Sequence, residues 1–265
     1  MTPSRHQPPP GLAAAFDLSG KVAIVTGGNG GIGLAIARGL AAAGAGIVIA
    51  GRSDEKNRRA ERDLAEAGAT VMALNADVTR EEDCKRLAAE AFAAFGRIDI
   101  LVNNAGTNVR KQPEEYSLEE WHMLLDANLT SAFLATMAVF PMMKRTGGKI
   151  INIGSMTSLF GAGFAAPYGA SKGGVVQLTK ALASAWAQHG IRVNAILPGW
   201  IETDLTIRGR AATPHLHDQV IARTPAGRWG RPDDLAAAAV FLAGPGSDFV
   251  TGIALPVDGG YAAQA

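Results

Sequence analysis

Seven short apolar runs, most of them rich in β-branched residues, alternate with stretches of helical composition along this chain. The runs are Val22–Val25, Ile47–Ala50, Thr70–Leu74, Ile98–Val102, Lys149–Ile153, Ile191–Ile196 and Ile253–Val257, and the helical stretches lie at about 34–40, 55–67, 81–95, 118–144, 168–189 and 232–243. Continuous apolar strands separated by helices are typical of a parallel sheet that is covered on both faces. We therefore predict an α/β fold, a single doubly wound domain around a seven-stranded parallel sheet.

The first run leads into a glycine-rich turn and then into the first helical stretch. The turn reads Thr26-Gly27-Gly28-Asn29-Gly30-Gly31-Ile32-Gly33. Glycines let the backbone approach a pyrophosphate, and the N–H groups that begin the next helix point at its phosphates. The turn fits two patterns: G-x-G-x-x-G on Gly28, Gly30 and Gly33, and T-G-x-x-x-G-x-G on Gly27, Gly31 and Gly33. Both predict a dinucleotide-binding domain of the Rossmann type.

Tyr168 and Lys172 stand four residues apart in a predicted helix, so their side chains share one face, a turn apart. A phenol titrates near ~10, and an adjacent ammonium stabilises its phenolate. Ser155, after the fifth apolar run, can hydrogen-bond the oxygen on which Tyr168 acts. The three predict proton exchange with a carbonyl or alcohol oxygen, the part of hydride transfer that a cofactor does not perform. The pair alone is equally compatible with a core aromatic and a solvated lysine.

Four of the predicted strands end at a glycine or a polar residue. Gly27, Asp77, Asn103 and Ser155 each stand where an apolar run ends. Ligands of open parallel sheets bind at the carboxyl ends of the strands, where the winding reverses. We therefore expect these four positions to converge on one edge of the sheet.

In this order and spacing, the motifs resemble those of the short-chain dehydrogenase/reductase family, from Leu18 to Gly260. The resemblance is carried by the glycine turn in its second register, Asn103-Asn104-Ala105-Gly106, Asn128, Ser155, Tyr168, Lys172, Pro198-Gly199 and Val257-Asp258-Gly259-Gly260. It implies an NAD(P)-dependent oxidoreductase that acts on CH–OH groups, and a homotetramer.

The resemblance also implies a role for each site residue. Tyr168 is expected to be the acid or base, Lys172 to lower its pKa and bind the nicotinamide ribose, Ser155 to orient the substrate oxygen, and Asn128 to hold a water that links Lys172 to solvent. The expected cofactor-binding residues are Gly27, Asn29, Gly31, Ile32, Gly33, Arg52, Ser53, Asp77, Val78, Asn104, Ala105, Gly106, Tyr168, Lys172, Pro198, Gly199, Ile201 and Thr203. Two alternatives stay open: Asn128 as an ordinary helix amide and Thr203 as a helix cap.

Cofactor choice depends on the residues after the second run, Gly51-Arg52-Ser53-Asp54. Relatives that use NAD usually place an acid first in this stretch, where it binds the adenosine ribose hydroxyls. Glycine cannot do so, whereas Arg52 offers a planar charged fork suited to a 2′-phosphate. We expect NADP(H), with NAD(H) as the alternative if Arg52 merely stacks on adenine. Gly51→Asp is expected to reverse the preference, and Asp54 lies one position too late to act in its place.

For the substrate, the chain most resembles gluconate 5-dehydrogenase and 2-deoxy-D-gluconate 3-dehydrogenase types. That resemblance rests on Arg110, on Arg223-Thr224-Pro225-Ala226-Gly227-Arg228-Trp229-Gly230 and on Ser247-Asp248-Phe249-Val250. Those relatives often carry an arginine between the catalytic Ser and Tyr, which this chain lacks. The candidate substrate contacts are Arg110, Met156, Phe160, Phe164 and Trp200.

Three functions follow from these residues. The first is a dehydrogenase or reductase of a secondary alcohol or ketone, with a sugar acid or polyol as the expected substrate. The second is a 3-oxoacyl-thioester reductase or a ketone reductase of broad specificity on the same scaffold. The third is a non-catalytic dinucleotide sensor, against which the intact Ser155, Tyr168 and Lys172 set argues.

Composition argues against several other classes of function. With 25 basic and 24 acidic residues, the chain has no basic excess for nucleic acid or an anionic membrane, and its one cysteine, Cys84, permits no internal disulfide. We expect a cytoplasmic protein without a metal site. Residues 1–16 are predicted to be a disordered tail, 17–265 the domain, and about 201–226 a mobile lid over the substrate.

Overall fold

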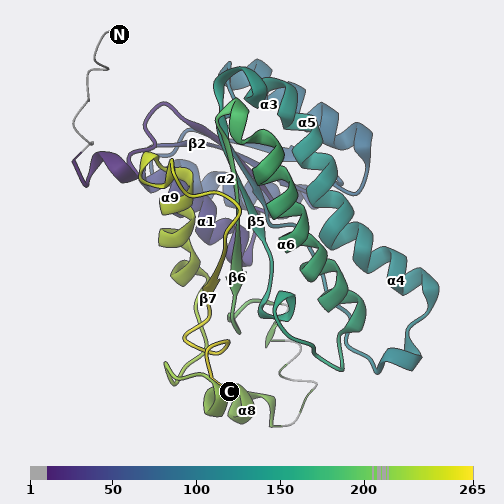
Figure 1. Ribbon diagram of the computed structural model, residues 1–265. Helices are drawn as coiled ribbons and strands as arrows, with labels where there is room; N and C mark the ends of the chain where they lie inside the picture. The colour runs from purple at the N-terminus through teal and green to yellow at the C-terminus, as the bar shows by residue number, and fades with distance from the viewer. Residues whose placement is uncertain (1–10, 205, 208–209, 211–212, 214, 265) are drawn as a thin grey trace, which may run out of the picture.

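Seven strands form one sheet in which every neighbouring pair is parallel (Figure 1). The computed structural model describes residues 11–264 except 205, 208, 209, 211, 212 and 214. The strands are β1 (Val22–Thr26), β2 (Gly46–Gly51), β3 (Val71–Asn75), β4 (Ile100–Asn103), β5 (Gly148–Ile153), β6 (Ile191–Pro198) and β7 (Ala254–Val257). Their order, β3-β2-β1-β4-β5-β6-β7, reverses direction between β1 and β4. The predicted doubly wound fold is confirmed.

Helices cover both faces of the sheet (Figure 1). The long ones are α1 (Gly31–Ala42), α2 (Asp54–Glu66), α3 (Glu81–Phe95), α4 (Leu118–Leu125), α5 (Ser131–Thr146), α6 (Ala166–Trp186), α8 (Leu216–Arg223) and α9 (Ala236–Ala243). Short helical turns are η1 (Ala14–Phe16), η2 (Pro113–Glu115), η3 (Asp126–Thr130, a π turn), η4 (Met156–Ser158), η5 (Ala187–His189), η6 (Pro232–Leu235) and η7 (Pro245–Ser247). Helices α1, α2 and α9 pack on one face, and α3, α5 and α6 on the other.

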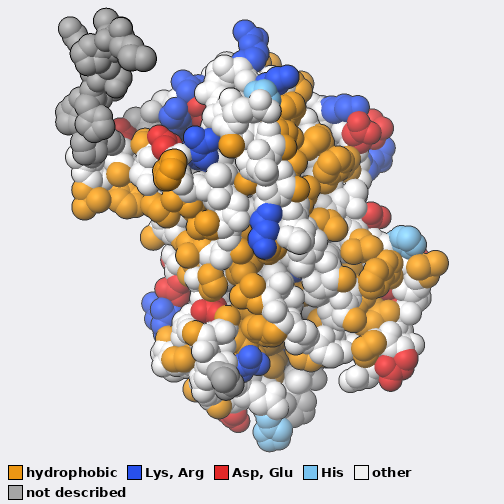
Figure 2. Space-filling view, in the orientation of Figure 1, with side chains coloured by type: hydrophobic (Ala, Val, Ile, Leu, Met, Phe, Trp, Pro, Cys, Tyr) orange, Lys and Arg blue, Asp and Glu red, His pale blue; other side chains and the backbone are white. Residues whose placement is uncertain are grey.

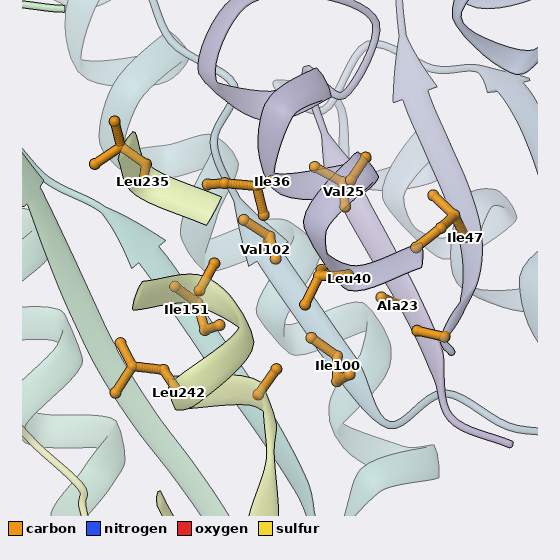
Figure 3. Close-up of a cluster of buried hydrophobic side chains, with 14 of the residues drawn as sticks. Ala23, Val25, Ile36, Leu40, Ile47, Ile100, Val102, Ile151, Leu235 and Leu242 are labelled. Atoms are coloured by element: carbon orange, nitrogen blue, oxygen red, sulfur yellow. The ribbon is translucent and has the colours of Figure 1, made fainter. Parts of the chain in front are cut away.

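Alternate side chains of each central strand enter opposite cores, because successive residues of a strand point to opposite faces. Val25 and Val102 pack under α1, against Ile36 and Leu40 (Figure 3). Their neighbour Leu101 enters the core on the α3 side. A strand that is buried on both faces needs an unbroken apolar run, which is the pattern that the sequence shows.

A series of hydrogen-bonded, buried polar side chains crosses the core near the carboxyl ends of β4 and β5. Asn103, at the end of β4, donates from Nδ2 to Thr136 on α5 at 2.9 Å and to Asn152 on β5 at 2.8 Å. Asn152 in turn donates to the hydroxyl of Thr179 on α6 at 2.8 Å. Buried polar groups are stable only when they are paired. This chain therefore fixes α5 and α6 relative to the strands that carry the site.

The structure differs from the predicted elements at two places. The stretch predicted as one helix at 118–144 contains a π turn at Asp126–Thr130, which follows α4 directly and precedes α5. The predicted tail at 1–16 is ordered at its end, because η1 forms and Phe16 packs against Phe241 on α9 with ring centroids 6.4 Å apart. The rest of that prediction, for residues 1–10, lies outside the described residues.

The stretch Leu118–Thr146 is long and apolar enough to cross a membrane by length and composition, with a mean hydropathy of 1.5 over an 18-residue window. Only 39% of that window is buried. Its exposed large side chains include Leu118, Trp121, Met123 and Phe133. Figure 2 shows hydrophobic patches on the side of the molecule where α4, α5 and α6 lie, with few charged side chains between them.

Candidate active site

The ends of β1 and β4 are joined by one hydroxyl. Thr26 donates from Oγ1 to the carbonyl of Val102 at 3.3 Å and accepts from the backbone N–H groups of Asn104 and Ala105 at 3.0 and 3.1 Å. The glycine turn and the Asn-Asn-Ala-Gly segment therefore leave the sheet side by side, at the point where the strand order reverses. This is the edge at which ligands of such sheets bind.

The conformation of the glycine turn decides between its two registers. Gly27 and Gly31 have positive φ angles of 63° and 50°, which side chains rarely adopt. A Cβ on Gly33 would lie 2.3 Å from the carbonyl oxygen of Gly27. A Cβ on Gly30, by contrast, would meet nothing within 4 Å. The T-G-x-x-x-G-x-G register is the one that the backbone requires.

The start of α1 fits a phosphate group. Its N-cap residue, Gly30, provides no side chain to bond the first N–H groups, and the first turn holds no acidic residue. Unpaired N–H groups and the helix dipole together favour an anion at such a terminus. The residues at this edge therefore fit the pyrophosphate of a dinucleotide.

Asn104 and Asp77 lie at this edge, but much of their hydrogen-bonding capacity is used within the protein. Asn104 donates from Nδ2 to the carbonyls of Thr26 and Gly27 at 3.0 and 3.1 Å, so it holds the glycine turn. Asp77 accepts at Oδ1 from the N–H and the hydroxyl of Thr79. Val78, the next residue, is nearly buried. The expected adenine and ribose contacts of these residues stay predictions.

Ser155 is held by a neighbour that the sequence analysis did not identify. Ser158 accepts at Oγ from the N–H of Ser155 at 3.2 Å and donates to the main-chain carbonyl of Lys172 at 2.7 Å. Its hydroxyl therefore ties Ser155 to the helix that carries the other two catalytic candidates. The spacing S-x-x-S of a capping box was the available signal.

Tyr168 and Lys172 lie on one face of α6, with Lys172 Nζ 5.7 Å from the centre of the phenol ring. Burial raises the pKa of Tyr168, and the Ser155 hydroxyl and the positive charge of Arg110 oppose that rise. Burial also lowers the pKa of Lys172 from 10.5 to about 8. Lys172 is 4% exposed, and its Nζ donates to the carbonyl of Ile153 at 2.7 Å. The predicted Ser155, Tyr168 and Lys172 set thus comes together at the end of β5.

Asn128 is buried in the π turn, and its side chain is fully engaged. It donates from Nδ2 to the carbonyls of Thr107 and Leu124 at 2.9 and 2.8 Å, and Oδ1 accepts from the N–H of Thr107 at 3.1 Å. A Cβ on Gly106 would lie 2.5 Å from Oδ1. The amide is thus not an ordinary surface group, because it fixes the segment that follows β4.

At the end of β2, Arg52 is exposed, and among the described residues no ion pair or side-chain hydrogen bond involves its guanidinium. Ser53 caps α2 by accepting from the N–H of Lys56 at 3.4 Å. Asp54 accepts from Asn75 Nδ2 at 2.6 Å, so its carboxylate is already paired. The charged side chains in this stretch are Arg52 and Asp54. Among the described residues only Asp54 has a side-chain partner, so Arg52 is the one available to bind a ligand.

The candidate substrate contacts form two aromatic clusters. Arg110 is half-buried with its guanidinium 5.2 Å from the ring centre of Trp200 and 5.6 Å from that of Phe164, and burial lowers its pKa. Phe160 stacks on Tyr261 at 5.9 Å. Met156 is 6% exposed, in η4 beside Ser155.

Two residues of the second cluster, Arg223 and Tyr261, were not among the predicted substrate contacts. Arg223, at the end of α8, lies over both Phe160 and Tyr261, at 4.9 and 4.4 Å. It joins the predicted lid, the segment after Ser155 and the C-terminal turn. No local motif marks such a long-range contact.

The segment after β6 begins with close packing. A Cβ on Gly199, which follows Pro198, would lie 2.6 Å from Asp258 Cα, so glycine is required there. Ile201 is 3% exposed and packs in the core, and its carbonyl accepts from Thr206 Oγ1 at 2.6 Å, so its expected contact with the cofactor stays a prediction. Thr203 accepts from the N–H of Thr206 at 3.4 Å, which supports the cap interpretation. Residues 205, 208, 209, 211, 212 and 214 of the predicted lid lie outside the described residues.

Comparisons with known proteins find chains that are similar to this one over nearly its whole length. A family profile described as "Enoyl-(Acyl carrier protein) reductase" matches residues 27–262. The chain is 44% identical over 252 residues to 2-dehydro-3-deoxy-D-gluconate 5-dehydrogenase of Bacillus subtilis, covering 94% of this chain and 98% of the relative. It is 41% identical over 246 residues to gluconate 5-dehydrogenase of Gluconobacter oxydans, covering 92% and 96%.

A solved structure is similar over nearly the whole chain. It is a gluconate 5-dehydrogenase of Burkholderia cenocepacia in complex with NADP and tartrate. The TM-score is 0.92 at 41% sequence identity, and the match covers 96% of this chain and 100% of the other.

The buried ammonium of Lys172 predicts a pH-dependent stability. Its pKa is about 8 in the folded protein and 10.5 when unperturbed, so between these values the unfolded state binds more protons and stability rises with pH. Below pH ~8 both states are protonated and the cost of burying the charge is complete. Relative to Lys172→Met, the wild-type free energy of unfolding should increase by about 2–3 kcal/mol from pH 7 to pH 10.5, measured by urea denaturation.

Lys180 is the matched control, because it lies exposed on the same helix. The difference between wild type and Lys180→Met should not change with pH in this range. A constant difference for Lys172→Met as well would show that its ammonium is not desolvated.

Proposed function

The chain belongs to the short-chain dehydrogenase/reductase family, and on that premise we propose that it interconverts a secondary hydroxyl of a sugar acid and the corresponding ketone with NADP(H). As a member of this family it is an oxidoreductase that acts on CH–OH groups. The sugar acid is the substrate class that Arg110 supports best. The names of the relatives, which refer to gluconate and its derivatives, point to the same class.

The acid–base step falls to Tyr168. In ketone reduction its phenol gives a proton to the carbonyl oxygen, and in alcohol oxidation the phenolate takes the hydroxyl proton. Ser155, whose hydroxyl helps to lower the pKa of the phenol against the effect of burial, would orient the same substrate oxygen. When bound, the nicotinamide supplies or accepts the hydride.

Lys172 supplies positive charge beneath the phenol. With a pKa of about 8 it is largely protonated at neutral pH and can restore the proton that Tyr168 gives up. Because the side chain of Asn128 is bound to Thr107 and Leu124, a proton relay through this residue would use its main-chain carbonyl. The π turn that contains Asn128 interrupts the regular helix ladder at this point.

The cofactor is NADP(H), and this chain offers a site for each part of it. The glycine turn and the start of α1 would hold the pyrophosphate, and the guanidinium of Arg52 would bind the 2′-phosphate. Relatives of known structure contain NADP, which supports the same choice. NAD(H) is the alternative only where Arg52 acts by stacking.

Arg110 is the observation that carries the substrate class. Its guanidinium is half-buried between Phe164 and Trp200, near enough to Tyr168 for its charge to affect that pKa. Within the described part of the chain, no carboxylate forms an ion pair with it. A desolvated cation without a partner binds an anion strongly, and a substrate carboxylate supplies one.

Two further polar atoms support a hydroxylated substrate. Among the described residues, Asn108 Oδ1 and Thr157 Oγ1 are buried and lack a hydrogen-bond partner. They are chain neighbours of Arg110 and Ser155 respectively. Buried atoms of this kind are costly unless something pairs with them, and substrate hydroxyls would do so only if binding uncovers these atoms.

A second candidate is the reduction of 3-oxoacyl thioesters or other bulky ketones. Two observations favour it: the exposed apolar side chains of Leu159 and Phe164 beside the site, and the description of the matching family profile. Neither accounts for the unpaired charge of Arg110. Acyl thioesters are therefore included as competing substrates in the test below.

We also propose that the protein is cytoplasmic and assembles as a homotetramer. The apolar face over α4, α5 and α6 would pair with a second copy, which explains why Leu118–Thr146 is apolar without being deeply buried (Figure 2). The C-terminal segment from Gly252 onward would form a second contact. Small residues on α6, including Ala181 and Ala185, permit close helix approach.

Removing the phenol hydroxyl should separate catalysis from binding. Tyr168→Phe should lower kcat by about 10²–10⁴, the usual contribution of a general acid or base. The dissociation constant of NADPH, measured by nicotinamide fluorescence, should change little. Near-normal turnover would show that another group transfers the proton.

Arg110→Leu tests the substrate class. Loss of one charge-assisted contact should lower kcat/KM for gluconate by about 10- to 150-fold, while an uncharged hexitol loses little. The assay follows reduced cofactor over a panel of sugar acids, hexitols and 3-oxoacyl thioesters. Arg145→Leu, at an exposed position in the last turn of α5, is the control. Equal losses for acid and hexitol, or a thioester as the best substrate, would contradict the sugar-acid proposal.

Phe133→Asp tests the assembly. Its side chain is 44% exposed on α5, and a charge there would be buried if two copies pair through this face. Sedimentation at micromolar concentration should show a tetramer for wild type and smaller species for the variant. Phe92→Asp on α3, at a site 40% exposed, should leave the tetramer intact. A wild-type monomer would exclude this assembly.

A further inference from the structure

Two asparagine side chains from distant parts of the chain meet at the end of β2. Asn57, on α2, is 3% exposed. Its Nδ2 donates to the carbonyl of Gly51 at 2.8 Å and to that of Leu74 at 3.2 Å, which joins the ends of β2 and β3. Asn29, in the glycine turn, donates from its Nδ2 to Asn57 Oδ1 at 2.6 Å.

The orientation of both amides is determined by these bonds. Asn57 uses its Nδ2 for two main-chain carbonyls, so only its Oδ1 can face Asn29. Asn29 must then present an N–H to it, and cannot turn without losing the bond. The position of Asn29 in the turn is thus set by a buried residue of α2.

The pair occupies the space that a side chain at position 51 would need. A Cβ on Gly51 would lie 2.3 Å from Asn29 Nδ2 and 2.7 Å from Asn57 Oδ1. Both distances are far below ordinary van der Waals contact. Gly51 is therefore required as long as the two asparagines stay bonded. The expectation that Gly51→Asp alone reverses cofactor preference conflicts with this geometry.

Ser53 and Asp54, the other polar residues after β2, already have hydrogen-bond partners. Asp54 is paired with Asn75, and Ser53 caps α2. One oxygen of the exposed Asp54 carboxylate is therefore occupied, and the acid that the asparagine pair excludes is one at position 51 itself. Arg52 is the charged group that remains available to the 2′ position.

We propose that Asn57 is a specificity-determining positioning residue. By holding the Asn29 amide over Gly51, it excludes an acidic side chain from the position that would bind the ribose hydroxyls, and it leaves the 2′ position to Arg52. The inference rests on the proposed use of NADP(H), and it assigns that preference to a buried hydrogen bond in addition to an exposed arginine.

The test measures dissociation constants of NADPH and NADH by fluorescence titration, without substrate. Gly51→Asp alone should weaken both cofactors by about 10-fold or more, because the new side chain displaces the asparagine pair. Gly51→Asp combined with Asn57→Ala should bind NADH at least about 10-fold more tightly than Gly51→Asp alone and should prefer NADH over NADPH.

Asn57→Ala removes a buried donor from the carbonyls of Gly51 and Leu74 and can prevent folding. Gly51→Asp combined with Asn29→Ala is therefore a second route, because it removes the amide that lies closest to position 51 and keeps Asn57 in place. It should show a partial recovery of NADH binding, because Asn57 Oδ1 would still lie 2.7 Å from the added Cβ. Gly30→Ala, in the same turn but with nothing within 4 Å of the added Cβ, should keep the wild-type unfolding midpoint.

Two outcomes would overturn the proposal. One is a Gly51→Asp variant that by itself binds NADH as tightly as wild type binds NADPH. The other is a pair of double variants whose effects are the sums of the single ones, since independent sites add. Because no substrate is present in the titration, an error in the substrate proposal leaves these results unchanged.

Discussion

The parallel pairing of β1 with β4 is the constraint on which the remainder of this protein depends. Strands β2 and β3 extend the sheet to one side of β1, and β4 begins the other side. Loops from both directions therefore leave the sheet at one edge. Thr26 joins the two strand ends with a single hydroxyl. The glycine turn, the Asn104 segment and the face of α6 that carries Tyr168 and Lys172 are near one another because of this topology, although Asn104 and Tyr168, for example, stand 64 positions apart in the chain.

Asparagine side chains organise this edge. The side-chain amides of Asn57, Asn104 and Asn128 each hydrogen-bond main-chain atoms at this edge, and so hold the segments there in place. An amide suits this task because it offers both a donor and an acceptor and carries no charge that must be desolvated. The charged groups near the site, Arg52 and Arg110, lack such internal partners among the described residues and so are the ones suited to bind ligands.

Much of this arrangement could be predicted from local patterns. Apolar runs identified all seven strands, and the glycine turn, Ser155, Tyr168 and Lys172 identified the site, because each signal is a short-range motif. The roles of Asn57 and Ser158 could not be predicted, since both act through contacts with residues distant in sequence. The function of Gly51 was misjudged for the same reason: the sequence shows a missing side chain, but only the structure shows which atoms fill its place.

The π turn at Asp126–Thr130 makes the two halves of a long helical stretch differ in phase by one residue. One residue of an α-helix corresponds to about 100° of rotation about its axis. Deleting a residue here would restore a regular helix and turn α4 by that angle relative to α5, carrying Leu118 and Trp121 away from the direction of Phe133. The extra residue of the π turn, which contains the buried Asn128, thus also sets how the exposed apolar side chains of α4 and α5 line up. A change in this turn would therefore alter the candidate active site and the apolar face over α4 and α5 together.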